Sequence, residues 1–127
     1  GDFDIALFCV KSYDLQTSYT QLQHTLHPQS VVLSFSNGVN NGDILRKLST
    51  SKVLDGAIYI LSHIEKAGVI RKKGKVFAAV FGGDKEATRK LSEVFENAQL
   101  RHKTPENITH ALWKKYIFIS AFATLTS

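Results

Sequence analysis

Cysteine, methionine and long hydrophobic runs are scarce or absent in this sequence. The scarcity of cysteine and the lack of long hydrophobic runs each exclude a class of protein. The 127 residues include one cysteine, Cys9, so the chain cannot build a disulfide framework. No apolar stretch approaches the roughly 18 residues of a membrane span, and no basic-then-apolar signal segment opens the chain. We therefore expect a soluble cytoplasmic protein, with Cys9 buried as a small hydrophobe in the apolar run from Ile5 to Val10.

Methionine is absent altogether, and neither end of the sequence carries the usual signals of a terminus. A strand pattern starts almost immediately after Gly1, and an apolar helical pattern continues to Thr126 and Ser127 without a Gly, Asn or Pro to end it. We therefore expect an internal fragment of a longer protein. Its 43% hydrophobic content is enough for one modest core.

A strong charge of either sign is missing as well. The 16 Lys and Arg residues stand against 11 Asp and Glu residues, which gives a formal net charge of +5. We interpret the short basic run from Arg71 to Lys75 as a solvated hairpin edge rather than a nucleic-acid surface. The charge balance is equally compatible with an anionic small molecule such as a phosphorylated cofactor. His24 and His27 lie one helical turn apart without a third ligand, so we expect no metal.

The first half of the sequence alternates strand and helix patterns. Continuous apolar runs predict strands buried on both faces at Phe3 to Val10, Val31 to Phe35 and Val53 to Leu61. Helical spacing predicts a helix between each pair, carried by Leu15, Tyr19, Leu22 and Leu26 before Pro28 and by Ile44, Leu45 and Leu48. This order predicts an α/β fold with a parallel sheet covered by helices, which is half of a doubly wound fold.

The second half changes character. An antiparallel meander is predicted by three short strand patterns with glycine turns between them: Ile58 to Ile64, Val69 to Arg71 and Val76 to Phe81, separated by Ala67-Gly68 and Lys73-Gly74. Asp84 is expected to cap a helix, and Leu100 to His102 fits a short edge strand. Gly82-Gly83-Asp84 could instead accept an anion at that helix start, although a plain turn with a capping Asp is the simpler reading.

A last helix is predicted to start at Thr104, Pro105 and Glu106, which combine a capping hydroxyl, a proline and an acid. From Ile108 onward its residues are apolar on nearly all faces, so something must bury them. We expect this helix to pack against another copy of the chain.

Two polar residues directly follow predicted parallel strands. Lys11 follows the first strand and Asn37 follows the second. In an open parallel sheet ligands bind beyond the carboxyl ends of the strands, so both residues are candidates for contact with a nucleotide. The alternative is structural: Lys11 would be a surface residue at a helix entry, and Asn37 a left-handed turn residue before Gly38.

Lys115 is a candidate proton donor. It falls on the apolar stripe of the last helix, formed by Ile108, Leu112, Ile119 and Phe122, whereas Lys114 does not. A lysine on such a stripe either extends its charge to water or has its pKa lowered by burial, and the second case makes it an acid near neutral pH. A lysine that only extends its charge to water needs no functional role.

Four segments taken together resemble the ordered motifs of the ketopantoate reductase family. They are Val10-Lys11-Ser12-Tyr13-Asp14, Leu33-Ser34-Phe35-Ser36-Asn37-Gly38-Val39, Gly68-Val69-Ile70 and Ala111-Leu112-Trp113-Lys114-Lys115. Their order and spacing match over essentially the whole chain. The resemblance implies a Rossmann-like NADP-binding domain over residues 1–103, lacking its fingerprint strand, and the start of an all-helical substrate domain over residues 104–127.

The resemblance also implies roles for individual residues. Lys11 and Asn37 would line the cleft for nicotinamide and substrate, and the backbone around Leu61 would approach the nicotinamide amide. Lys115 matches the family's proton-donating lysine, which also contacts the substrate. The implied reaction is the NADPH-dependent reduction of 2-dehydropantoate (ketopantoate) to pantoate, a step of pantothenate biosynthesis.

One departure bears on the substrate. Where the family often carries two asparagines that hold the hydroxy acid, this sequence has Ile119 and Ala123. A related reductase of another 2-keto acid is therefore an alternative. A third possibility is a non-catalytic binding or interaction module.

Overall fold

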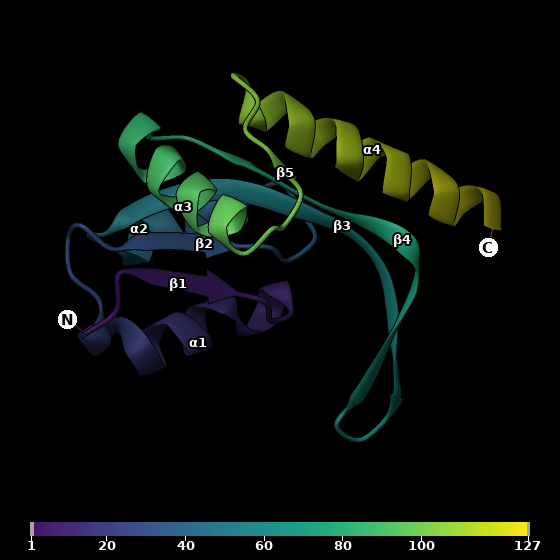
Figure 1. Ribbon diagram of the computed structural model, residues 1–127, viewed down its shortest axis with the longest axis horizontal. Coiled ribbons are helices and arrows are strands. Elements are labelled where there is room, and N and C mark those ends of the chain that lie inside the picture. Colours follow the sequence, from purple (N-terminus) through teal and green to yellow (C-terminus); the bar gives the residue numbers. More distant parts are fainter. Residues whose placement is uncertain (1, 127) are drawn as a thin grey trace.

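The computed structural model describes residues 2–126, with side chains up to Ala121. Figure 1 shows a twisted sheet with helices on both faces, a long hairpin projecting from it and a C-terminal helix lying across one end. The elements are β1 (Ile5–Phe8), η1 (Ser12–Asp14), α1 (Leu15–Leu22), η2 (Gln23–Thr25), β2 (Val31–Ser34), α2 (Asn41–Leu48), β3 (Lys52–Lys66), β4 (Val69–Gly82), α3 (Lys85–Asn97), β5 (His102–Lys103) and α4 (Ile108–Thr126).

The predicted parallel sheet is confirmed for the first three strands. Over the described residues the strand order is β1-β2-β3-β4-β5. β1 pairs with β2 in parallel, with Ile5 opposite Val31, and β2 pairs with β3 in parallel, with Leu33 opposite Leu54. Short helices connect these strands, as the alternating sequence pattern predicted.

β2 contributes to two hydrophobic clusters, because its alternate side chains project from opposite faces of the sheet. Val31 and Leu33 point toward α3 and join the cluster that includes Phe81 and Phe95. Val32 points the other way and packs with Leu15, Tyr19 and Leu45 of α1 and α2. All four residues of β2 are buried, which confirms the prediction of a strand covered on both faces.

The same prediction is wrong for β1. In the described part of the chain β1 is an edge strand, and Leu7 is 44% exposed while Phe8 is buried against Tyr19. Cys9, predicted to be buried, is exposed just beyond the strand. A continuous apolar run predicts burial on two faces, but a strand with a neighbour on one side only leaves part of its surface uncovered.

The predicted three-strand meander is a single hairpin. β3 and β4 pair antiparallel from Asp55 opposite Gly82 to Lys66 opposite Val69, so the chain reverses at Ala67-Gly68 and nowhere else between them. The prediction of a second reversal at Lys73-Gly74 is wrong, because Gly74 forms part of a bulge inside β4. Residues 73–76 lie opposite Leu61 there, and Gly74 adopts a φ of +68°.

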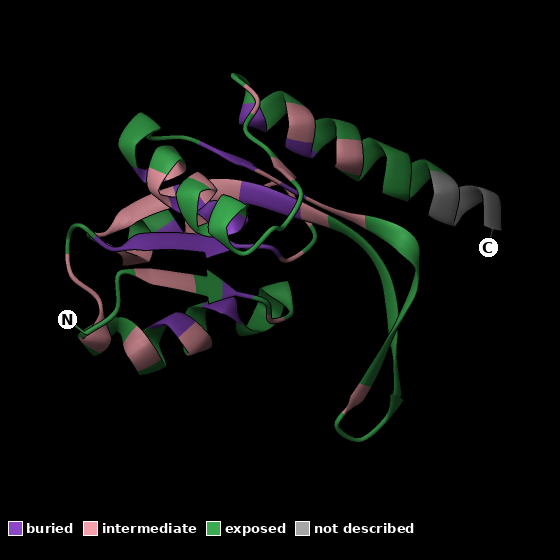
Figure 2. Cartoon of the chain, viewed as in Figure 1, coloured by how far each residue is buried: buried purple, intermediate pink, exposed green. Residues whose placement is uncertain are grey.

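The hairpin has a buried and an exposed half. Figure 2 shows buried residues concentrated where β3 and β4 cross the body of the molecule, and exposed residues along the projecting part. Gly56 lies in the buried half, where an added Cβ would meet Leu33 Cδ1 at 2.8 Å and the Val80 carbonyl at 3.0 Å. The close approach of these groups therefore requires glycine.

The C-terminal elements follow their predicted order with a shift at one boundary. The Asp84 carboxylate accepts a hydrogen bond from the Ala87 amide at 2.9 Å, which confirms it as the cap of α3. β5 adds to β4 in parallel, close to the predicted edge strand. The predicted start of the last helix at Thr104–Glu106 is wrong: α4 begins at Ile108, and the Asn107 side chain accepts from the His110 amide at 2.9 Å. Asn is as good a cap as Thr, and it lies nearer the apolar stripe.

α4 lies on the sheet by its first turns only. Ile108 and Leu112 are buried against Ala57, whereas Ile117 and Phe118 further along are exposed. The expected self-association through this helix stays a prediction, as does its assignment to a second domain. Over residues 2–126 no helix is both long and apolar enough to cross a membrane.

Candidate functional site

The loops that follow β1 and β2 form one rim at the carboxyl edge of the parallel sheet. The Ser12 hydroxyl donates to the Asn37 carbonyl at 3.0 Å, and the Ser36 hydroxyl donates to the Val10 carbonyl. A depression of about 450 Å³ lies between the two loops, lined by residues that include Lys11 and Asn37. The two residues predicted to share this edge are therefore brought together.

Asn41, a residue that the sequence analysis missed, holds the second loop in place. Its side chain is buried and its Nδ2 donates to the carbonyls of Ser36 and Asn37 at 3.1 and 3.3 Å. Asn37 does not have a positive φ, whereas Gly38 after it has a φ of +126°, so Asn37 is not the left-handed turn residue of the structural alternative. The Asn37 side chain is thereby free to make a contact of its own.

That contact is with Lys115, which reaches the rim from α4. Lys115 Nζ donates to Asn37 Oδ1 at 3.3 Å and to the Ile58 carbonyl at 2.7 Å. It also lies 5.0 Å from the centroid of the Tyr59 ring. Residues 58, 37 and 115 are far apart in sequence, and the packing of α4 on β3 brings them to one point.

Burial lowers the pKa of the Lys115 ammonium, because its charged form has lost part of its hydration and gains only neutral partners. The side chain is half-buried. Lys114, its neighbour, is exposed and points away from the stripe, as the helical spacing predicted. The two lysines thus occupy different environments on one helix.

The other candidate residues lie at different distances from the Lys115 ammonium. Lys11 is exposed at the entry of η1, and it shares the depression with Asn37. Leu61 is 61% exposed on β3, two residues beyond Tyr59, where the hairpin leaves the body. His27 Nε2 lies 3.3 Å from Asp4 Oδ1, and the described residues contain no group of three potential metal ligands.

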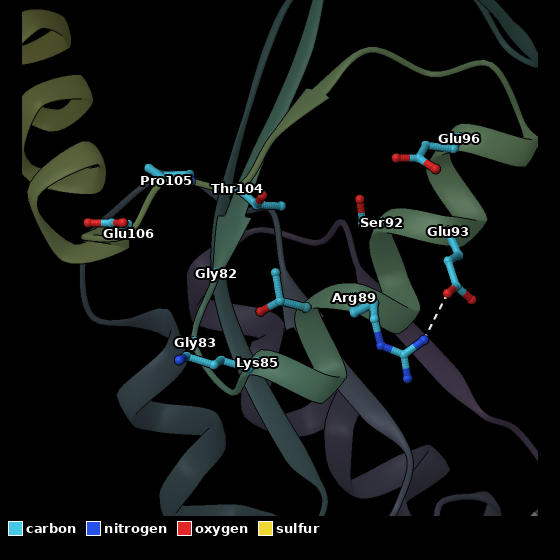
Figure 3. A pocket seen from close by; sticks show the side chains of 11 residues that line it. Gly82, Gly83, Lys85, Arg89, Ser92, Glu93, Glu96, Thr104, Pro105 and Glu106 are labelled. Atoms are coloured by element: carbon cyan, nitrogen blue, oxygen red, sulfur yellow. Dashed lines mark hydrogen bonds and ion pairs between the residues drawn. The ribbon is translucent and has the colours of Figure 1, made fainter.

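A larger cavity than the depression at the rim lies elsewhere and contains none of these residues. It measures about 750 Å³ and separates α3 from the segment Thr104–Glu106 (Figure 3). Its polar side chains carry both signs of charge, and two of them, Arg89 and Glu93, pair at 2.9 Å. Size alone does not identify a reactive site, and the candidate site is placed instead at Lys115, a half-buried cation with a lowered pKa at the sheet edge.

Known proteins match both the sequence and the fold. The sequence profile of the family "Ketopantoate reductase PanE/ApbA" matches residues 1–83. The uncharacterized oxidoreductase YkpB of Bacillus subtilis (strain 168) is 30% identical over 132 residues, which cover 100% of this chain and 44% of that protein. A 2-dehydropantoate 2-reductase of Pyrococcus abyssi is 28% identical over 121 residues, with 93% and 40% covered.

Solved structures agree with this match. The crystal structure of 2-dehydropantoate 2-reductase from Porphyromonas gingivalis W83 superposes with a TM-score of 0.87 at 26% identity, over 99% of this chain and 46% of that one. A D-mandelate dehydrogenase in complex with NADH shares the fold alone, with a TM-score of 0.78 at 19% identity over 90% of this chain and 40% of that one.

The chain spans less than half the length of the curated relatives it matches. The profile match nonetheless covers well over half of its residues, and the mixed α/β sheet is that of the Rossmann-like reductases. The predicted resemblance is therefore confirmed, and the chain belongs to the ketopantoate reductase family of oxidoreductases.

Proposed function

We propose that the full-length protein reduces 2-dehydropantoate to pantoate with NADPH, and that Lys115 is its proton donor. The observation that carries this proposal is the half-buried Lys115 ammonium, held by the Ile58 carbonyl and Asn37 Oδ1 at the carboxyl edge of the sheet. Ligands of open parallel sheets bind at that edge. The Pyrococcus abyssi relative carries the same activity in its name.

Lys115 is suited to act on a carbonyl oxygen. Reduction adds a hydride to the carbonyl carbon, and the electron pair of the C=O π bond moves onto the oxygen. Two of the three ammonium donors contact protein acceptors, which leaves the third for that oxygen. Lys115 then transfers this proton, and its lowered pKa brings its acidity closer to neutral pH, where a general acid works best.

The chain's own residues fit the nicotinamide end of a dinucleotide. When bound, NADPH supplies the hydride. Lys11 offers an exposed cation on the wall of the depression, and Asn37 presents an amide in the same wall beside Lys115. A cation and an amide can hold ribose hydroxyls or a substrate carboxylate through several donors. By the family resemblance, the backbone near Leu61, two residues beyond Tyr59 on β3, would face the nicotinamide amide.

A related reductase of another 2-keto acid is the second candidate. Ile119 is one turn beyond Lys115 on α4 and half-exposed, where many family members place an asparagine. An apolar side chain there cannot hydrogen-bond a substrate hydroxyl, so it would suit a 2-keto acid with an apolar tail. The side chain of Ala123 lies outside the described residues.

The test of the proposed function is a pair of lysine variants in the full-length protein. Lys115→Ala should lower kcat by about 100- to 10,000-fold, the usual contribution of a general acid. NADPH affinity should change little, because the lysine acts only as the oxyanion forms. Turnover is followed as NADPH oxidation against a panel of 2-keto acids that includes 2-dehydropantoate.

Lys114→Ala is the matched control, one residue away on an exposed face. It should retain the parent rate. The mechanism is wrong if Lys114→Ala is the crippled variant, or if both variants keep the parent turnover. A substrate other than 2-dehydropantoate with a higher kcat/KM would select the second candidate and leave the role of Lys115 intact.

A further inference from the structure

The contact between β3 and α4 follows the period of the strand. Ala57 and Tyr59 are two residues apart, so their side chains project from the same face of β3. Ala57 is buried against Leu112 of α4, and Tyr59 meets Lys115 in the next turn of that helix. Ile58 projects from the opposite face and packs against the core under α3. The register of strand against helix therefore presents an aromatic ring to the lysine.

The groups around the Lys115 ammonium attract its charge without carrying a full charge themselves. They are the Ile58 carbonyl at 2.7 Å, Asn37 Oδ1 at 3.3 Å and the Tyr59 ring at 5.0 Å from its centroid. β3 thus contributes a carbonyl and one titratable group, the Tyr59 phenol, and the loop after β2 contributes an amide. Burial is the cause that lowers the pKa of Lys115, so whatever keeps the amine protonated must come from these neutral groups.

We propose that Tyr59 is a positioning residue, whose ring face holds the Lys115 ammonium against the Ile58 carbonyl and keeps it charged. This inference rests on the proposed function, in which the charged lysine is the proton donor. The ring face carries the negative part of the aromatic quadrupole, and its attraction for a cation grows as water is removed. The ring also restricts the long lysine side chain, which would otherwise occupy many rotamers.

Two substitutions in the full-length protein separate the effect of the Tyr59 ring from the effects of its hydroxyl and of its side-chain size. Tyr59→Phe keeps the ring and removes the hydroxyl, and Tyr59→Leu keeps an apolar side chain and removes the ring. Tyr59 is 38% exposed, so either should be tolerated. Tyr59→Met serves as a second ringless variant if Tyr59→Leu does not fold.

The readouts are the Lys115 pKa, from an NMR titration of labelled lysine side chains, and the pH profile of kcat. Without the ring the ammonium loses stabilisation, so the pKa of Lys115 falls further. The donor must be protonated, and activity is lost as pH rises through its pKa. The alkaline limb of the Tyr59→Leu profile therefore moves to lower pH, with a loss of about 2- to 30-fold at alkaline pH. Tyr59→Phe should follow the parent.

Tyr116→Leu is the matched control. Tyr116 is a half-exposed aromatic on α4 whose ring meets Trp113 at 5.7 Å. Its replacement should leave both readouts unchanged. If the loss of any aromatic side chain near the site were enough to change them, Tyr116→Leu would change them too.

Several outcomes would overturn the inference. The ring has no such role if Tyr59→Leu and Tyr59→Phe behave alike, or if the pKa of Lys115 stays the same or rises in Tyr59→Leu. A lowered rate with an unchanged alkaline limb would indicate a purely structural effect. The two proposals fail separately: a pKa that falls in Tyr59→Leu while Lys115→Ala keeps its turnover would reject the proposed acid but retain the contact.

Discussion

Both halves of the β3–β4 hairpin are paired antiparallel, but they have opposite surroundings. Near the body, Leu54, Ala79 and Phe81 are buried under α3. Beyond Tyr59 the same two strands continue to Lys66 and Val69, but their side chains are almost all exposed (Figure 2). Ladder hydrogen bonding thus extends well past the region that the core stabilises.

This difference teaches that the candidate site lies at a boundary. Ile58 is packed against the core, while Tyr59 lies beside α4 and is 38% exposed and Leu61 is 61% exposed. Lys115 binds the Ile58 carbonyl at this junction, where the Ile58 side chain packs into the core and the neighbouring surface is still open to a ligand. A site built on a rigid element keeps its geometry better than one on a loop.

The largest expected contrast between the halves is in amide hydrogen exchange. The amides of Ala79 and Phe81 should exchange only through global opening, whereas those of Ile64 and Ile70 should exchange through local fraying. We expect protection factors that differ by about 1000-fold or more, which corresponds to roughly 4 kcal/mol. Exchange measured by NMR or mass spectrometry tests this. Equal protection would mean that the projecting half is covered in the full-length protein.

Truncating one large side chain in each half should give the next largest contrast. Phe81 is a fully buried residue of β4 whose ring centroid lies 5.3 Å from that of Phe95, so Phe81→Ala should lower the free energy of unfolding by about 3–5 kcal/mol through the cavity it leaves. Ile70 is exposed, and Ile70→Ala should change it by less than about 0.5 kcal/mol. Denaturant unfolding of both variants measures the difference. A comparable loss at Ile70 would show that something covers it.

Glycines in the two halves should respond differently, with smaller effects. Gly56→Ala inserts a Cβ 2.8 Å from Leu33 Cδ1 and should cost about 1–3 kcal/mol of stability through crowding. Gly74 has open space around it but a φ of +68°. Because Asn tolerates this conformation, Gly74→Asn should cost less than about 1 kcal/mol. Thermal unfolding of the two variants checks this, and a greater loss in Gly74→Asn would contradict it.

Much of the fold was predictable because local signals and tertiary packing agree there. The apolar run at β2, the helical spacing after Asp84 and the order of strands and helices all predicted what is observed. Errors arose where a local signal had two structural meanings. Gly74 predicted a turn, yet a glycine with positive φ serves a bulge equally well.

The sequence predicted members of the candidate site one residue at a time, and their catalytic and binding roles stay predictions. Position after a strand identified Lys11 and Asn37, and helical spacing separated Lys115 from Lys114. No such signal identified Tyr59 and Asn41. Tyr59 contacts a lysine on another helix, and Asn41 bonds to the Ser36 carbonyl in the preceding loop, so both depend on the tertiary structure. A tyrosine in an apolar strand pattern is typical of any β-strand.

The sequence by itself determined the alternation of strands and helices in the first half of the chain and the face of α4 on which Lys115 lies, since these depend on the periods of strand and helix. Only the tertiary structure decided that Lys115 meets Asn37, the Ile58 carbonyl and the Tyr59 ring. The register of α4 on β3 sets those contacts, and it is fixed by the burial of Ile108 and Leu112 against Ala57. Such packing joins residues distant in sequence, so no local pattern can specify it.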